Sequence, residues 1–179
     1  MSTSGADSAA DPSVAGPRLP RDLESDPRVA DVRAALQADV RMLWARGTLG
    51  VAVVPLSPGL RSALAVLGAA GRIERGLEAA EATLAAEQRG FAALPPAVAA
   101  CQKPRISRVL VVSNDGAERF YRSVERLALA HAARVLVCLV DCPSAVLGEL
   151  CYGPGAVAKL VLTGHKTAAT SLLRALAAS

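Results

Sequence analysis

Apolar residues form two alternating patterns along the second half of the chain. Short, mostly apolar runs, typical of strands buried on both faces of a sheet, occur at 108–113, 134–140 and 156–162. Segments long enough for helices follow each of them, at 117–132, 143–151 and 166–178. Such alternation predicts a sheet that is largely parallel where right-handed crossovers connect its strands, with helices on both of its faces.

The first half of the chain has a less regular pattern. Asp26-Pro27-Arg28 is typical of a helix start, with an N-cap and then proline at the first helical position. Apolar residues then recur at helical spacing, which predicts a helix over 26–47. A strand at 49–56 and helices at about 60–68 and 77–88 are expected to follow.

These elements predict a three-layer α/β/α sandwich with a mixed four-stranded sheet and an extra N-terminal helix. Residues 1–25 are rich in Ser, Ala, Gly, Pro and Asp without periodicity, which predicts a disordered tail. The remaining residues, 48–179, are expected to form one domain. Three prolines and several basic residues mark an irregular insertion at 89–105.

Composition is that of a folded chain, with 52% hydrophobic and 20% charged residues. Residues 1–98 contain 10 Lys and Arg and 11 Asp and Glu, a net charge of about −1. Residues 99–179 contain 10 Lys and Arg and 5 Asp and Glu, a net charge of about +5. A basic second half favours a phosphate-rich partner. The four cysteines form no CxxC pair, and neither a membrane-spanning run nor a secretory or organellar leader is recognisable. A nuclear, nucleolar or cytoplasmic protein without membrane contact is therefore expected, in preference to a mitochondrial one.

Three features stand out within residues 108–163. They are a strand ending in a small residue and an acid (VLVVSND, 109–115), a strand running into Pro-Ser and Leu-Gly (VCLVDCPSAVLG, 137–148), and a further apolar strand at 157–162. In these features the segment resembles the kink-turn RNA-binding ribosomal-protein superfamily. That superfamily includes archaeal and eukaryotic ribosomal proteins, small nucleolar ribonucleoprotein cores, an RNase P subunit and the Gadd growth-arrest proteins. Upstream, RGLEAAEA (75–82) resembles its motif of a basic residue, Gly, any residue, Asn, Glu, two residues and Lys. Glu78, Ala79 and Ala82 stand here in place of the Asn, Glu and Lys.

The resemblance implies an RNA groove between the start of the helix at 77–88 and the loop at 143–148. A basic cluster at the edge of the insertion is a further candidate. The expected RNA-binding residues are Arg72, Arg75, Gly76, Glu78, Lys103, Arg105, Arg108, Pro143, Ser144, Ala145, Leu147 and Gly148. In the plainer interpretation, the arginines are solvated surface charges and residues 143–148 are an ordinary helix start.

The expected function is that of a non-catalytic RNA-binding subunit of a ribosome-related, small nucleolar or RNase P/MRP-like particle. Its partners would be structured RNA and other ribonucleoprotein subunits. The alternative is a Gadd-type protein-interaction module that has lost RNA binding, which the missing Asn, Glu and Lys favour. A Rossmann-like enzyme is disfavoured, because the glycines at 153–155 precede a strand instead of following one. His131 and His165 have no spaced metal-ligand partners, so neither a metal nor a cofactor is expected.

Overall fold

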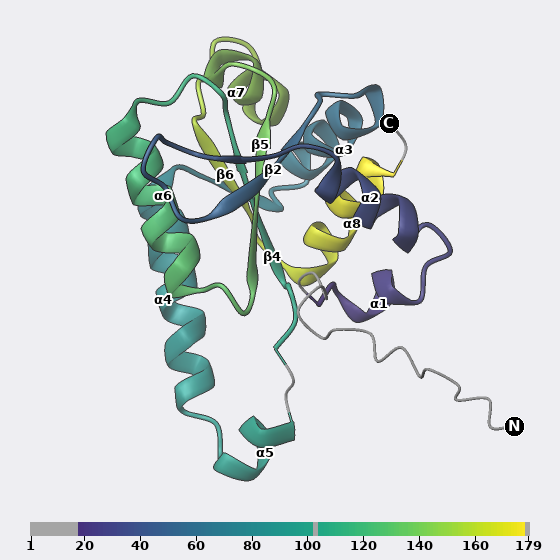
Figure 1. Ribbon diagram of the computed structural model, residues 1–179, viewed down its shortest axis with the longest axis vertical. Coiled ribbons are helices and arrows are strands. Elements are labelled where there is room, and N and C mark those ends of the chain that lie inside the picture. The colour runs from purple at the N-terminus through teal and green to yellow at the C-terminus, as the bar shows by residue number, and fades with distance from the viewer. Residues whose placement is uncertain (1–17, 102–103, 178–179) are drawn as a thin grey trace, which may run out of the picture.

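The computed structural model describes residues 18–101 and 104–177 (Figure 1). A six-stranded mixed sheet runs through the molecule in the order β1-β2-β5-β4-β6-β3. Strands β2, β5 and β4 are parallel, whereas β1, β6 and β3 are antiparallel to their neighbours. The strands are β1 (Val40–Met42), β2 (Gly50–Val54), β3 (Ile73–Arg75), β4 (Arg108–Val112), β5 (Val135–Val140) and β6 (Leu160–Thr163). The predicted mixed α/β class is confirmed, but the predicted count of four strands is wrong, because β1 and β3 extend the sheet at its two ends.

Helices cover both faces of this sheet. In Figure 1, α4 and α6 run along one face, and α2, α3 and α8 lie on the other. The helices are α1 (Arg21–Glu24), α2 (Val29–Ala38), α3 (Pro58–Ala69), α4 (Leu77–Ala92), α5 (Pro96–Cys101), α6 (Glu118–Ala130), α7 (Ser144–Tyr152) and α8 (Lys166–Leu176). Two apolar clusters result, one on each side of the sheet.

Strand β4 lies at the centre and supplies both clusters. Its side chains alternate between faces, so Val109 and Val111 pack against α3 and α8, while Leu110 and Val112 pack against α4 and α6. All five residues of β4 are buried. A strand covered on both faces needs a continuous apolar run, which explains why the sequence pattern located it correctly.

The predicted helix at 26–47 is wrong beyond Ala38. There the chain becomes extended, and β1 pairs with β2, with the Val53 amide donating to the Asp39 carbonyl at 2.8 Å. Leu36, Val40 and Leu43 fit a helical period by spacing alone, but pairing with β2 outweighs that local preference.

The predicted irregular segments are partly ordered. Helix α1 falls inside the expected tail at 1–25, of which residues 1–17 lie outside the described part. The expected insertion at 89–105 begins inside α4 and contains α5. Residues 102–103 are outside the described part.

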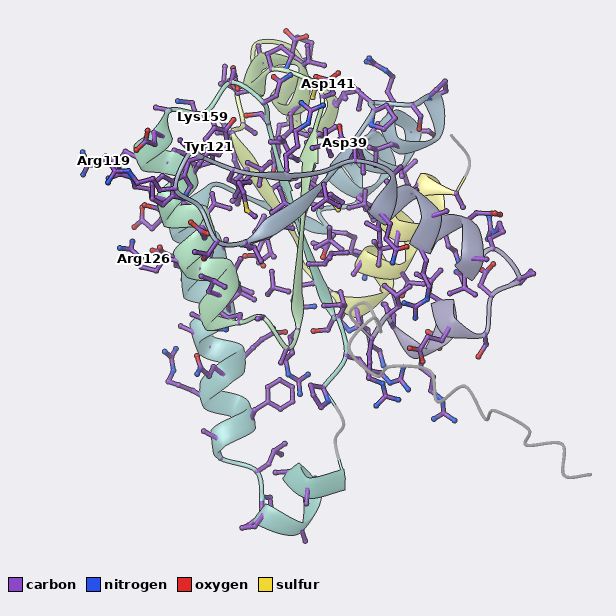
Figure 2. All side chains as sticks on the ribbon, in the orientation of Figure 1. Asp39, Arg119, Tyr121, Arg126, Asp141 and Lys159 are labelled. Atoms are coloured by element: carbon purple, nitrogen blue, oxygen red, sulfur yellow. The ribbon has the colours of Figure 1, made fainter. Side chains whose placement is uncertain are left out.

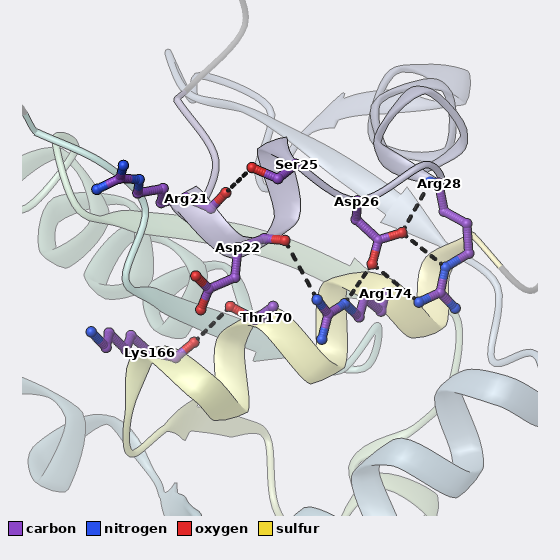
Figure 3. A network of polar contacts seen from close by, with 8 residues as sticks. All are labelled: Arg21, Asp22, Ser25, Asp26, Arg28, Lys166, Thr170 and Arg174. Atoms are coloured by element: carbon purple, nitrogen blue, oxygen red, sulfur yellow. Dashed lines mark hydrogen bonds and ion pairs between the residues drawn. The ribbon is translucent and has the colours of Figure 1, made fainter.

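A polar network ties the N-terminal helices to the last helix (Figure 3). The Asp26 carboxylate accepts hydrogen bonds from the Arg28 amide at 3.0 Å and from Arg174 Nε at 2.8 Å. Arg174 also donates to the Asp22 carbonyl at 3.4 Å. The Arg28 side chain, followed by its amide and then Arg174, holds the pKa of Asp26 well below its usual range.

A buried carboxylate holds the loop between β1 and β2 against α6. Glu125 accepts hydrogen bonds from Trp44 Nε1, from the Thr48 amide and hydroxyl, and from the Leu49 amide at 2.8 Å. Burial raises the pKa of Glu125, but the bonds from Thr48, Trp44 and Leu49 outweigh it, so the pKa lies below its ordinary value. This one side chain therefore connects the N-terminal hairpin to the central part of the fold.

Replacing Glu125 with Gln is expected to lower the free energy of unfolding at pH 7 by about 2 kcal/mol, because buried donors lose a charged acceptor. A folded-state pKa below the unfolded value of about 4.3 means that the ionised group stabilises the fold above that pH. The difference between wild type and variant should therefore shrink as pH falls below about 4. Urea unfolding across this range measures it.

Glu118→Gln is the matched control, since Glu118 forms an exposed ion pair with Arg122 one turn along α6. Its expected effect is about 0.3 kcal/mol. Equal effects of the two substitutions at pH 7 would contradict the anchoring role of Glu125.

Candidate functional site

Two segments far apart in sequence meet at one edge of the sheet, the edge formed by the carboxyl ends of its parallel strands. Strands β2, β4 and β5 run in the same direction and end at this edge. Strand β3 is antiparallel to β6, which is itself antiparallel to β4, so β3 also ends here, at Arg75. The start of α4 therefore lies at the same edge as the start of α7. We call residues 75–78, 143–148 and 153–159 the rim.

Backbone contacts with segment 153–159 and the first residue of β6 hold the rim together. The Gly76 amide donates to the Leu160 carbonyl at 2.9 Å, and the Ala158 amide donates to the Ser144 carbonyl at 2.9 Å. Arg75 Nη2 donates to the Val157 carbonyl at 2.5 Å, and the guanidinium carbon lies 5.5 Å from the centroid of the Tyr152 ring. Two of the predicted segments are thus brought together through a third that was not predicted to take part.

Only part of the 143–148 segment is accessible. Pro143 and Ala145 are exposed, whereas Ser144, Leu147 and Gly148 are buried. A Cβ at Gly148 would lie 2.3 Å from the Ala156 carbonyl oxygen, so the glycine allows α7 to touch the rim segment. Leu147 and Gly148 therefore shape the rim from beneath and do not face a ligand.

The N-terminus of α7 is already satisfied from within the chain. Asp115, in the loop after β4, accepts hydrogen bonds from the Ser144 amide at 2.9 Å and from the Ser144 hydroxyl at 2.7 Å. Burial raises the pKa of Asp115, but the bonds from Ser144 and Ser113 outweigh it and leave that pKa below its usual range. An internal carboxylate thus occupies the position where an anion would bind to this helix.

Among the residues that the structure describes, no side chain gives the N-terminus of α4 such a partner. Its N-cap is Gly76, at φ 88°. Gly76 can adopt this positive φ without strain, which turns the chain from β3 directly into the helix. Glu78 is exposed in the first turn, where it suits the helix dipole but repels phosphate.

Lys159 adds a cation to the rim. The sequence pattern did not predict this residue as part of the site. Figure 2 labels this exposed residue near the edge where β4 and β5 end. Its carbonyl accepts from the Ser113 amide at 3.0 Å, which places it between β4 and the start of β6. Its position is visible only after the sheet is assembled, because it lies inside a segment that the pattern assigned to a buried strand.

The other basic residues predicted for the site lie at the opposite edge of the sheet. Arg72 precedes β3, and its carbonyl accepts from the Gly164 amide beyond the far end of β6. Arg108 begins β4, is buried and pairs with Glu87, while Arg105 pairs with Glu24. Arg72 therefore does not line the groove with Arg75. Arg105 and Arg108, expected in a separate basic cluster at the edge of the insertion, form ion pairs within the chain. Lys103 lies outside the described residues.

Cys138, Cys142 and Cys151 are buried free thiols. Burial raises the pKa of the Cys138 and Cys151 thiols to about 12 and that of Cys142 to about 11, so none is an activated thiolate. Within residues 18–101 and 104–177, no group of three or more His, Cys, Asp or Glu could hold a metal ion. Nor does the described part of the chain contain a helix long and apolar enough to cross a bilayer.

The chain has weak structural similarity to solved proteins. No family model and no curated protein matches the sequence. Among solved structures, one described as a protein with unknown function from Bacillus halodurans C is similar at 18% sequence identity and a TM-score of 0.41. The match covers 67% of this chain and 97% of that one. A likeness of this degree supports no conclusion about function.

Substituting Gly148 with Ala is expected to destabilise the protein by about 3 kcal/mol, because the added methyl group overlaps backbone atoms of Ala156 and Val157. Gly90→Ala in α4 is the matched control, since a Cβ there meets nothing within 4 Å. It should stabilise by about 0.5–1 kcal/mol through helix propensity. Urea unfolding of both variants tests the pair, and a neutral Gly148→Ala would contradict the close contact.

Proposed function

We propose that the chain is a non-catalytic RNA-binding subunit of a ribonucleoprotein, such as a ribosomal, ribosome-biogenesis, small nucleolar or RNase P/MRP-like particle. The supporting observation is the juxtaposition of the Arg75–Gly76 turn with the exposed Pro143 and Ala145 across one rim. These belong to the two segments that resemble the RNA-contacting parts of the kink-turn superfamily. A three-layer α/β/α arrangement is part of the same proposal.

Within this proposal, a phosphate backbone lies across the start of α4. The amides at an uncapped helix start point outward and favour anions. Arg75 and Lys159 are exposed beside it and supply positive charge. Pro143 and Ala145 offer an apolar surface against which an unstacked base can rest. These contacts position a folded RNA without reading its sequence.

The second candidate is a Gadd-type protein-interaction module. Negative charge at and beside the rim favours it. Glu78 is exposed in the first turn of α4, and the exposed Glu149, next to segment 143–148, accepts a hydrogen bond from the Gly155 amide at 3.4 Å. A mixed-sign surface suits a protein partner with complementary charges better than a polyanion. The two candidates differ in how strongly binding depends on salt.

Neutralising Arg75 and Lys159 separately, as Arg75→Gln and Lys159→Gln, is expected to weaken binding to crosslinked cellular RNA. Each variant should reduce the slope of log affinity against log salt by about 1, the value of one phosphate contact. Fluorescence polarisation with an RNA recovered by crosslinking and sequencing measures the slope.

Arg72→Gln serves as the control, because this exposed arginine lies at the opposite edge of the sheet. Its slope should equal that of the wild type. If all three variants lost RNA binding equally, the RNA would not be bound at the rim. A chain that crosslinks no RNA but co-purifies with one defined protein would support the second candidate instead.

A further inference from the structure

The pairing of β2 with β5 does not extend to the first residues of β2. Their pairing covers only residues 52–54 opposite 138–140. Gly50 and Val51 therefore have no partner on β5, and residues 135–137 have none on β2. Glu125 accepts a hydrogen bond from the Leu49 amide at 2.8 Å, directly before the first residue of β2. The result is a slot between two adjacent strands of one sheet.

The backbone of β5 is directed into this slot. The Asp141 amide donates to the Val54 carbonyl at 2.9 Å, so Asp141 directs its backbone groups toward β2. Alternate residues of a strand direct these groups to the same side, so Val137 also points its amide toward β2. The pairing of β2 with β5 ends at Ala52 and Cys138, so no β2 residue is in register opposite the Val137 amide. The slot thus combines apolar walls with a backbone donor.

The slot is a cavity of about 270 Å³ with mostly apolar walls. Side chains from both faces of the sheet contribute, among them Leu36, Val51, Ala128 and Val135. An apolar cavity of about 150 Å³ accommodates benzene, so by proportion this one accommodates about ten non-hydrogen atoms. Apolar pockets with a few polar groups at one end are typical small-molecule sites.

Two polar side chains of α2, Arg33 and Gln37, are part of the lining. The Arg33 guanidinium lies 3.9 Å from a carboxylate oxygen of Glu24, at the limit of an ion pair. Glu24 pairs much more closely with Arg105 through its other oxygen. The Arg33 side chain is 38% exposed, so it remains available to a second anion.

We propose that this slot binds a small amphipathic carboxylate, with its hydrocarbon part between β2 and β5 and its carboxylate on Arg33 and Gln37. Charge complementarity selects this occupant over a neutral one, because the cavity walls are apolar and Arg33 is the cation in the described lining. The site lies away from the rim, and the proposal is independent of RNA binding.

Titration of isotope-labelled protein with octanoate, followed by amide NMR, tests the site. Octanoate has ten non-hydrogen atoms, and 1-octanol is the matched probe without charge. Octanoate should cause saturable shifts at Gly50, Val51 and Val137, and octanol should bind roughly tenfold more weakly, the loss expected for one charge-assisted hydrogen bond. Arg33→Gln should weaken octanoate binding by about the same factor and leave octanol unchanged.

Two further variants make the result decisive. Arg61→Gln removes an exposed arginine of α3 that is not part of the slot and should change neither probe. Ala132→Trp places a bulky group at an exposed position of the lining and should block both probes while the spectrum stays folded. Shifts that do not saturate at these amides would overturn the proposal. Equal binding of both probes, unaffected by Arg33→Gln, would also overturn it.

Discussion

The burial of β4 on both faces is the constraint on which the rest of the molecule depends. Its five residues are covered by helices on each side and by β5 and β6 along each edge. Even Arg108, at its start, is buried, and it pairs with Glu87 of α4. A buried charge without such a partner would cost several kcal/mol, so this arginine is committed to the fold. The helices on each face and the order of the strands follow from the need to cover this strand completely.

The strand order around β4 creates the rim. Strand β6 pairs antiparallel with β4, and β3 pairs antiparallel with β6, so a turn encoded near residue 76 arrives beside a helix that starts at residue 144. The same geometry sends Arg72 to the far edge, although it is only three residues from Arg75. The three-residue strand β3 lies between these two arginines and carries them to opposite edges of the sheet. Distance along the chain therefore says little about which charges can act together.

Glu125 shows how one buried carboxylate can determine a whole region. It satisfies backbone donors of the loop between β1 and β2, and in doing so it holds Leu49 against α6. The same hydrogen bonds fix the segment that leads into β2, next to the slot beside β5. A charged group in the middle of α6 thus supports both the loop between β1 and β2 and a candidate ligand site. The Thr48 amide that it binds is about 77 residues away in sequence.

The sequence by itself determined the elements whose own apolar pattern shows which face is buried. Strands β4 and β5 and helices α3, α6 and α8 were predicted correctly, because apolar periodicity reports directly on the faces that a segment must cover. Other features were decided by tertiary structure alone. Val40 to Met42 became a strand because β2 offered a free edge, and the three residues of β3 are too short to produce a pattern. Arg105 and Arg108 became structural because Glu24 and Glu87 lie opposite them in space. Pairing, ion pairing and strand direction are properties of residues that meet only after folding, so no local pattern in the chain encodes them.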